Sequence, residues 1–220
     1  MNSFKEVRGQ STWYRLFKKK SSGDIDRRMS TRPLERGHFD HHSDYYLVVN
    51  KHLGREWARA YVDAFMTPSD EVLETAEFFD EKYRIAMAPT IAVCYRGTDK
   101  HIEVKPTPIS HYFATVDKLL VSKSDAEVLI QTDQEQVRDA FVERYGTRCK
   151  YIEELPVTTG DRVLHSDSKL CGDRDVFAKN LYAMCLALSK SDVLVTHTGN
   201  VGFFLALHML ILQKKVIQFS

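Results

Sequence analysis

From residue 90 onward the chain alternates short apolar runs with longer amphipathic segments, and this alternation limits the folds open to it. The predicted strands are TIAVCY (90–95), EVLIQT (127–132), CKYIEEL (149–155), DVLVT (192–196) and KVIQF (215–219). The segments between them carry helical patterns, with a polar loop at about 156–173. Short apolar strands separated by helices are typical of a parallel sheet that is buried on both faces. We therefore predict an α/β fold with a Rossmann-like, doubly wound parallel sheet of about five strands.

The chain before residue 85 has a different character and is expected to form a reduced, mostly helical N-terminal part. Residues 1–37 contain ten Lys and Arg against four Asp and Glu, and we interpret them as a basic, partly flexible leader. Residues 38–84 are predicted to be helical, with one apolar stripe in the region 45–66 and a second helix beginning with Thr67 as its N-cap. Residues 85–220 form the predicted Rossmann-like domain.

The charge and cysteine patterns exclude several classes of protein and site. The net charge of +1 argues against a nucleic-acid partner, although the basic leader suits weak contact with a membrane surface. An apolar signal segment and a run of about 18 apolar residues are both missing, so we expect a cytoplasmic protein. Cys94 and Cys185 lie in apolar runs and are expected to be buried free thiols. The spacing of His38, His41 and His42 matches no common ligand pattern, so no metal site is expected.

Three strand ends carry side chains that suit a phosphorylated ligand. Arg96 follows the first strand in the packet YRGTDK (95–100), and its planar guanidinium fork matches a phosphate. Within that packet, Asp99 is expected to orient Arg96, and Lys100 adds a second positive charge. Their alternative role is a surface ion-pair cluster.

The second and third strand ends also carry residues that suit a phosphorylated ligand. Asp133 follows the second strand, where a carboxylate is suited either to bind a ribose or base or to cap the next helix. The turn THTGNVG (196–202) leads into an apolar helix, whose first N–H groups are suited to bind an anion; the alternative is an ordinary tight turn between a strand and a helix. Neither the G-x-G-x-x-G nor the P-loop pattern is present. Together the three ends indicate a nucleotide that carries a diphosphate.

The same segments resemble the motifs of the α-1,6-fucosyltransferase group, which includes the nodulation and core fucosyltransferases. YRGTDK, then Glu103 and TPISHYF, resembles its first motif, H-x-R-R-x-D-K followed by a glutamate and P-I-x-x-Y. LIQTDQ (129–134) is similar to the second motif, and LALSKSDVLVTHTGNVGFF (186–204) to the third. The resemblance covers about residues 67–219. It implies the C-terminal half of a GT-B glycosyltransferase that transfers a sugar, most simply fucose, from a GDP-sugar to a glycan hydroxyl, with inversion and without a metal or other cofactor.

The resemblance also implies roles for individual residues. The arginine that binds the diphosphate falls on Arg96, the following aspartate and lysine on Asp99 and Lys100, and the general base on Glu103 if one residue is deleted before the next motif position. The residues expected around the nucleotide are Tyr112, Asp133, Thr198, Gly199 and Asn200.

The sequence departs from the family pattern in the middle of these motifs. Gly97 stands where the family has a second arginine, Cys94 where it has histidine, and Gln134 where it has a second acid. Moreover, only about 85 residues precede the nucleotide-binding half, although a GT-B enzyme has two such halves. These departures leave open an alternative, a non-catalytic α/β domain that binds a nucleotide or a glycan.

Overall fold

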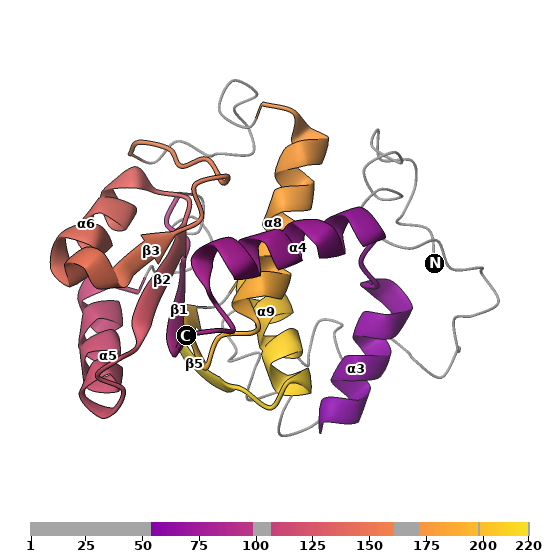
Figure 1. The fold of residues 1–220 in the computed structure, drawn as a ribbon, viewed down its shortest axis with the longest axis horizontal. Coiled ribbons are helices and arrows are strands. Elements are labelled where there is room, and N and C mark those ends of the chain that lie inside the picture. The colour runs from indigo at the N-terminus through magenta and orange to yellow at the C-terminus, as the bar shows by residue number, and fades with distance from the viewer. Residues whose placement is uncertain (1–53, 99–106, 161–171, 198, 220) are drawn as a thin grey trace.

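The computed structural model describes residues 54–98, 107–160, 172–197 and 199–219, and a parallel sheet lies at its centre (Figure 1). The strands are β1 (Thr90–Tyr95), β2 (Glu127–Thr132), β3 (Cys149–Tyr151), β4 (Val193–His197) and β5 (Lys215–Phe219). Their order across the sheet is β3-β2-β1-β4-β5, and every pairing is parallel. This confirms the predicted α/β fold and Rossmann-like sheet.

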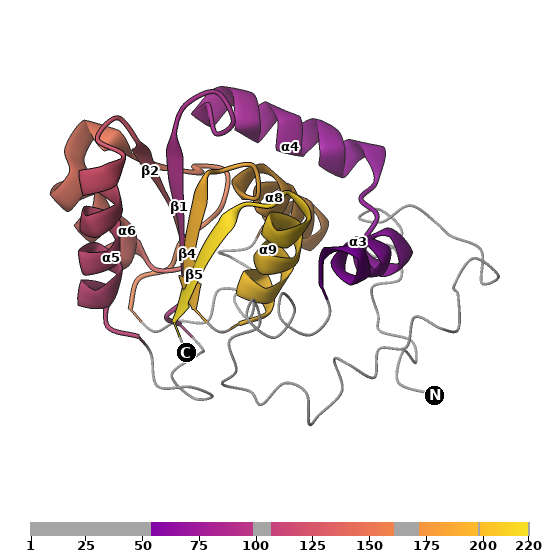
Figure 2. The same cartoon turned by 90° about the horizontal axis from the view of Figure 1, so that it is seen from below.

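Helices cover both faces of the sheet, as Figure 2 shows when the molecule is seen from below. One face carries α5 (Ile109–Ser122) and α6 (Glu135–Tyr145), and the other carries α8 (Arg174–Leu188) and α9 (Asn200–Ile211). Each face of the sheet forms an apolar core with the helices that cover it. Because successive strand residues point to opposite faces, each strand contributes side chains to both cores. In β1, for example, Ile91 and Val93 pack toward α5, whereas Ala92 and Cys94 pack toward α8.

The two described helices of the N-terminal part pack directly on this body. The apolar side of α4 (Asp70–Tyr83), which includes Val72 and Phe79, joins the core on the α8 face. α3 (Gly54–Phe65) packs against α9, with Ala58 and Val62 at the contact. The division of the chain at residue 85 stays a prediction, and the basic leader lies outside the described residues.

The start of α4 and the end of β3 differ from their predictions for identifiable reasons, and β4 begins and ends one residue later than predicted. The N-cap of α4 is Ser69, whose hydroxyl accepts a hydrogen bond from the N–H of Val72, and not Thr67, whose hydroxyl donates to the carbonyl of Asp63. β3 ends at Tyr151 instead of continuing to residue 155, because the chain turns there toward α4. The N–H of Glu153 donates to the Tyr83 hydroxyl at 2.8 Å. Contacts with α4 therefore replace strand pairing after Tyr151.

Other predictions for the chain concern its thiols and its long apolar segments. Cys94 and Cys185 are buried free thiols, as expected. Within the described ranges, none of the helices has both the length and the apolar character that crossing a bilayer demands.

Candidate functional site

The candidate site lies at the edge of the sheet where the strands end. β1 is flanked by β2 on one side and by β4 on the other, so the winding of the chain reverses between β1 and β4. In open parallel sheets this reversal leaves a crevice beyond the carboxyl ends of the strands, where ligands bind. Arg96 follows β1, Asp133 follows β2, and Gly199 follows β4 shortly before α9 begins. The topology thus brings the three predicted strand ends to one edge.

Asp133 holds the loop that follows β1. One carboxylate oxygen accepts a hydrogen bond from the N–H of Gly97 at 3.1 Å, and the other accepts one from the hydroxyl of Thr98 at 2.6 Å. The Nε atom of Arg96 lies 3.6 Å from the second oxygen. Asp133 is 6% exposed and Thr98 is 1% exposed, so these polar bonds form out of water, where they are stronger. The carboxylate therefore fixes both the backbone of the loop and the side chain of Arg96.

This arrangement gives Asp133 a structural role other than the predicted helix cap, and its predicted contact with a ribose or base stays a prediction. The N-cap of α6 is Gln134, which makes no capping side-chain bond, and the carboxylate of Asp133 points to the neighbouring loop instead. Asp133 also supplies the orienting contact to Arg96 that the sequence assigned to Asp99, a residue outside the described ranges. The register Tyr95↔Thr132 explains this contact, because it places the next residues of both strands side by side.

We expect Asp133→Asn to lower the free energy of unfolding by about 1–2 kcal/mol, because it weakens charge-assisted hydrogen bonds to a buried loop. The amide keeps the size of the carboxylate, so no cavity contributes to the change. Chemical denaturation with linear extrapolation measures the difference. Asp139→Asn is the matched control, since Asp139 is exposed and pairs with Arg138 on the surface of α6, and its change is expected to stay within about 0.5 kcal/mol. Equal losses in both variants would contradict the role given to Asp133.

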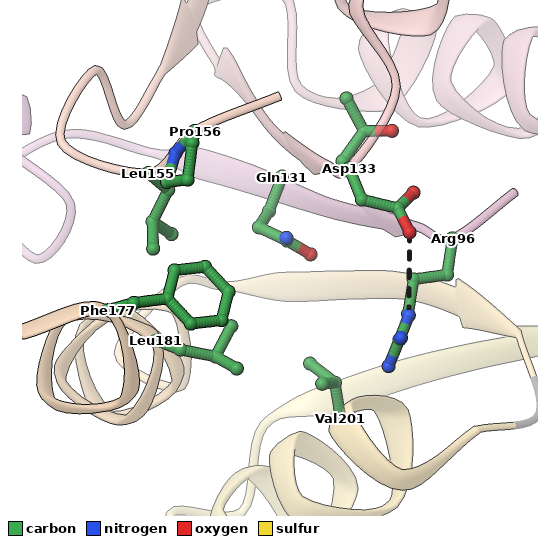
Figure 3. Close-up of a pocket in the computed structure, with 9 residues that line it drawn as sticks. Arg96, Gln131, Asp133, Leu155, Pro156, Phe177, Leu181 and Val201 are labelled. Atoms are coloured by element: carbon green, nitrogen blue, oxygen red, sulfur yellow. Dashed lines mark ion pairs between the residues drawn. The ribbon is translucent and has the colours of Figure 1, made fainter. Parts of the chain in front are cut away.

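A cavity of about 170 Å³ lies beside Arg96 on the α8 face of the sheet. Figure 3 shows Arg96 at one end of this cavity and Phe177 at the other, with the amide of Gln131 between them. The remaining wall is mostly apolar and comes from the segment after β3, from α8 and from α9. The lining residues are Arg96, Gln131, Thr132, Asp133, Leu155, Pro156, Phe177, Leu181 and Val201. The site therefore combines a cation with an apolar compartment.

Sequence reasoning found Arg96 and Asp133 but missed Gln131 and the apolar wall. Gln131 is an interior strand residue, and only the alternation of β2 places it on the same face as the buried Leu129. Phe177 and Leu181 lie one turn apart on α8, where their spacing is equally typical of core packing. Their position on α8 beside the carboxyl ends of the strands, rather than their residue type, makes them part of the site.

The third strand end brings the start of α9 to the same cavity. Gly199, which has no side chain that could cap the helix, is the N-cap of α9, and Val201 in the first turn lines the cavity. A Cβ atom on Gly202 would lie 2.5 Å from the carbonyl oxygen of His197. The lack of a side chain at Gly202 thus lets the first turn of α9 lie directly on the end of β4. Asn200 begins the helix, and Thr198 lies outside the described residues.

Two positions at which the sequence departs from the fucosyltransferase motifs lie against each other. A Cβ atom on Gly97 would come within 2.1 Å of the amide oxygen of Gln134. The amide nitrogen of Gln134 in turn donates to the carbonyl of Gly160 at 3.2 Å. A larger residue at position 97 would therefore require Gln134 to move. The glycine at position 97 and the glutamine at position 134 thus depend on each other.

Tyr112 lies in the core rather than at the surface of the crevice. Its ring is fully buried, with the ring of Tyr95 at 5.1 Å and that of Phe219 at 4.7 Å between centroids. Burial raises the pKa of its hydroxyl strongly, so the phenol stays neutral. A ring in this position reaches a ligand only if the side chains over it move, and its predicted contact with a nucleotide stays a prediction.

The other residues predicted for the first motif cannot be placed in this geometry. Lys100 and Glu103, like Asp99, lie outside the described residues. In the part of the chain that the structure describes, no group of three or more His, Cys, Asp or Glu side chains is arranged to hold a metal ion.

Comparison with known proteins gives a distant likeness in fold. No family model and no curated protein matches the sequence. Among solved structures, the chain is similar to NodZ alpha-1,6-fucosyltransferase co-crystallised with GDP, with a TM-score of 0.49 and 12% identity over 78% of this chain and 51% of that one. It is also similar to POFUT1 in complex with GDP, with a TM-score of 0.46 and 10% identity over 75% of this chain and 50% of that one. The chain thus spans about half the length of either protein.

Proposed function

We propose that the chain binds a nucleoside diphosphate sugar, with GDP-fucose as the best candidate, and that it acts as an inverting, metal-independent glycosyltransferase. The observation that carries this proposal is the guanidinium of Arg96, held by the buried carboxylate of Asp133 next to a cavity at the reversal point of the sheet. A cation fixed in this way needs little reorganisation to meet a diphosphate. The order of the three sequence motifs supports the choice of a GDP-sugar.

The proposed donor spans the described part of the site. Its diphosphate lies between Arg96 and the first turn of α9, where N–H groups and the positive end of the helix dipole favour an anion. Its remaining groups extend toward the apolar wall of the cavity near Phe177. Lys100 and Asp99 are proposed to act beside Arg96, as the resemblance implies.

In the proposed reaction, the acceptor hydroxyl attacks the anomeric carbon of the sugar. Glu103 takes the hydroxyl proton, a new carbon–oxygen bond forms, and the bond to the diphosphate breaks. The electron pair of the broken bond stays on the departing diphosphate, which Arg96 stabilises. Attack from the opposite face of the ring inverts the anomeric centre. The chain spans only about half the length of the similar enzymes. A glycan acceptor and a surface of this chain that binds it are therefore proposed as well.

A second candidate is a non-catalytic domain that binds a nucleotide or a glycan. The contact between Gly97 and Gln134 favours it, because this contact occupies the place at which the resembled motif has a second phosphate-binding arginine. One cation fewer at the diphosphate weakens the stabilisation of a leaving group more than it weakens ground-state binding.

Calorimetric titration of the wild-type chain with GDP, UDP and ADP tests the proposed ligand. We expect GDP to bind more tightly than ADP, with binding that weakens as salt is added because the phosphates carry the charge. The titration is repeated with and without Mg²⁺, and the affinity is expected to be unchanged. If none of the three nucleotides binds, the nucleotide-sugar proposal fails. A preference for UDP would retain a glycosyltransferase but exclude the assignment to GDP-fucose.

A further inference from the structure

The amide of Gln131 is held in one orientation by a buried thiol. Cys94 and Gln131 are paired residues of the neighbouring strands β1 and β2, and both side chains lie on the α8 face. The Sγ atom of Cys94 donates to the Oε1 atom of Gln131 at 3.1 Å. Burial raises the pKa of Cys94 to about 12, so the thiol keeps its proton at neutral pH. The carbonyl end of the amide is therefore directed toward Cys94.

The Gln131 side chain lines the cavity, and its Nε2 group is the end of the amide that does not accept the bond from Cys94. Figure 3 shows the Gln131 side chain projecting between the Arg96 end and the Phe177 end. Within the described part of the chain, no residue accepts a hydrogen bond from its Nε2 group. An amide nitrogen at a cavity wall requires an acceptor, and a bound ligand is one source of it.

The other polar groups of the lining have their acceptor atoms engaged within the protein. Both carboxylate oxygens of Asp133 accept hydrogen bonds from the loop after β1. The hydroxyl oxygen of Thr132 accepts the N–H of Gln134 at 3.1 Å. Among the lining side chains, Gln131 offers the cavity an amide donor, Arg96 lies at one end of the cavity, and Leu155, Pro156, Phe177, Leu181 and Val201 form the apolar wall. Such a compartment complements a flat apolar group that carries a hydrogen-bond acceptor.

The size of the cavity narrows the ligand group further. Complete drug-sized ligands occupy pockets of about 300–1,000 Å³. The cavity beside Arg96 measures about 170 Å³, which suits one ring system rather than a whole nucleotide sugar. A nucleobase is the part of a nucleoside diphosphate that is flat, apolar on its faces and polar at its edge.

We propose that Gln131 selects the nucleobase of the bound nucleotide by donating a hydrogen bond to a ring carbonyl oxygen, with Cys94 as the residue that positions its amide. This inference rests on the proposed function, because it places the base beside a diphosphate held by Arg96. It goes beyond that function in naming the residue and the chemical group that set specificity. A base with a keto group accepts this hydrogen bond. A base with an amino group at the same position places a second donor against the Nε2 group of Gln131 and binds less tightly.

Inosine diphosphate and adenosine diphosphate test the proposal because hypoxanthine carries a keto oxygen at the purine position where adenine carries an amino group. We expect IDP to bind the wild-type chain about tenfold more tightly than ADP, because IDP accepts a hydrogen bond from Gln131 whereas ADP places a second donor against it. Gln131→Leu should reduce this preference to less than about threefold, since leucine has no donor. Gln131→Glu should reverse it, because a carboxylate accepts from the amino group and repels the keto oxygen. Cys94→Ala should weaken the preference by releasing the amide.

Gln136→Glu is the matched control, since Gln136 is exposed on α6. This substitution introduces the same negative charge as Gln131→Glu, but away from the cavity. Thermal melting of each variant checks that it is folded. Equal affinities of the wild-type chain for IDP and ADP, or a preference that survives in Gln131→Leu, would overturn the inference. If both nucleotides bind equally and Arg96→Ala removes both, the inference fails while the proposed function stands. If neither binds the wild-type chain, the proposed function fails and the inference fails with it.

Discussion

Arg96→Ala is expected to weaken the binding of GDP about a hundredfold, the loss of two charge-assisted hydrogen bonds of roughly 1.5 kcal/mol each. The loss should fall on binding rather than on folding. Asp133 keeps its hydrogen bonds to Gly97 and Thr98 when the guanidinium is removed, so the loop after β1 stays anchored. Titration calorimetry gives the affinity, and chemical denaturation shows whether the stability is preserved.

Two companion variants separate geometry from charge. Arg96→Lys keeps the positive charge but lacks the planar fork, and we expect a loss of about tenfold for a ligand that is held by two parallel hydrogen bonds. Arg148→Ala is the control for a simple change in net charge, because Arg148 is exposed before β3, at the opposite edge of the sheet. A loss of affinity in Arg148→Ala equal to that in Arg96→Ala would show a general charge effect. Unchanged affinity in Arg96→Ala would place the diphosphate elsewhere on the molecule.

The sheet could be predicted closely from the sequence because its inner strands are continuous apolar runs. β1 and β2 have the predicted bounds, since helices cover both of their faces and most of their residues are buried. β3 is the informative exception. The part of the predicted strand CKYIEEL that does not pair, residues 152–155, contains Glu153 and Glu154, and both pair with Lys82 of α4. The ending of that strand depends on a helix more than sixty residues earlier, which no local pattern records.

The site was predictable in its composition but not in its contacts. The motifs pointed to Arg96 and Asp133 separately, and the pairing of the two follows only from the adjacency and register of β1 and β2. The sequence indicated Asp99, which lies outside the described residues, as a partner of Arg96 because it is near in the chain, and it did not indicate that Asp133 contacts Arg96. Gln131 gave no signal at all, since a polar residue inside a strand has no fixed meaning until its face and its neighbour Cys94 are known.

The distinction between an enzyme and a binding domain depends on Glu103, to which the resemblance assigns the role of general base. We expect Glu103→Gln to lower the turnover of GDP-fucose by about 10²–10⁴, because an amide of the same size cannot take the acceptor proton. The affinity for GDP should change by less than about threefold, since the general base acts on the acceptor and not on the diphosphate. Chromatography of GDP released from GDP-fucose, with a pool of oligosaccharides as acceptors, measures turnover, and calorimetry measures affinity.

Glu143→Gln, at an exposed position on α6, is the control for the same loss of charge and should leave both quantities unchanged. Full turnover in Glu103→Gln would remove that residue from the mechanism while leaving a transferase. The outcome that favours the binding domain is different: tight GDP binding that Arg96→Ala abolishes, together with no release of GDP from GDP-fucose by the wild-type chain. In that case the anchored arginine would serve recognition alone, and the contact between Gly97 and Gln134 would mark the place where a catalytic cation is missing.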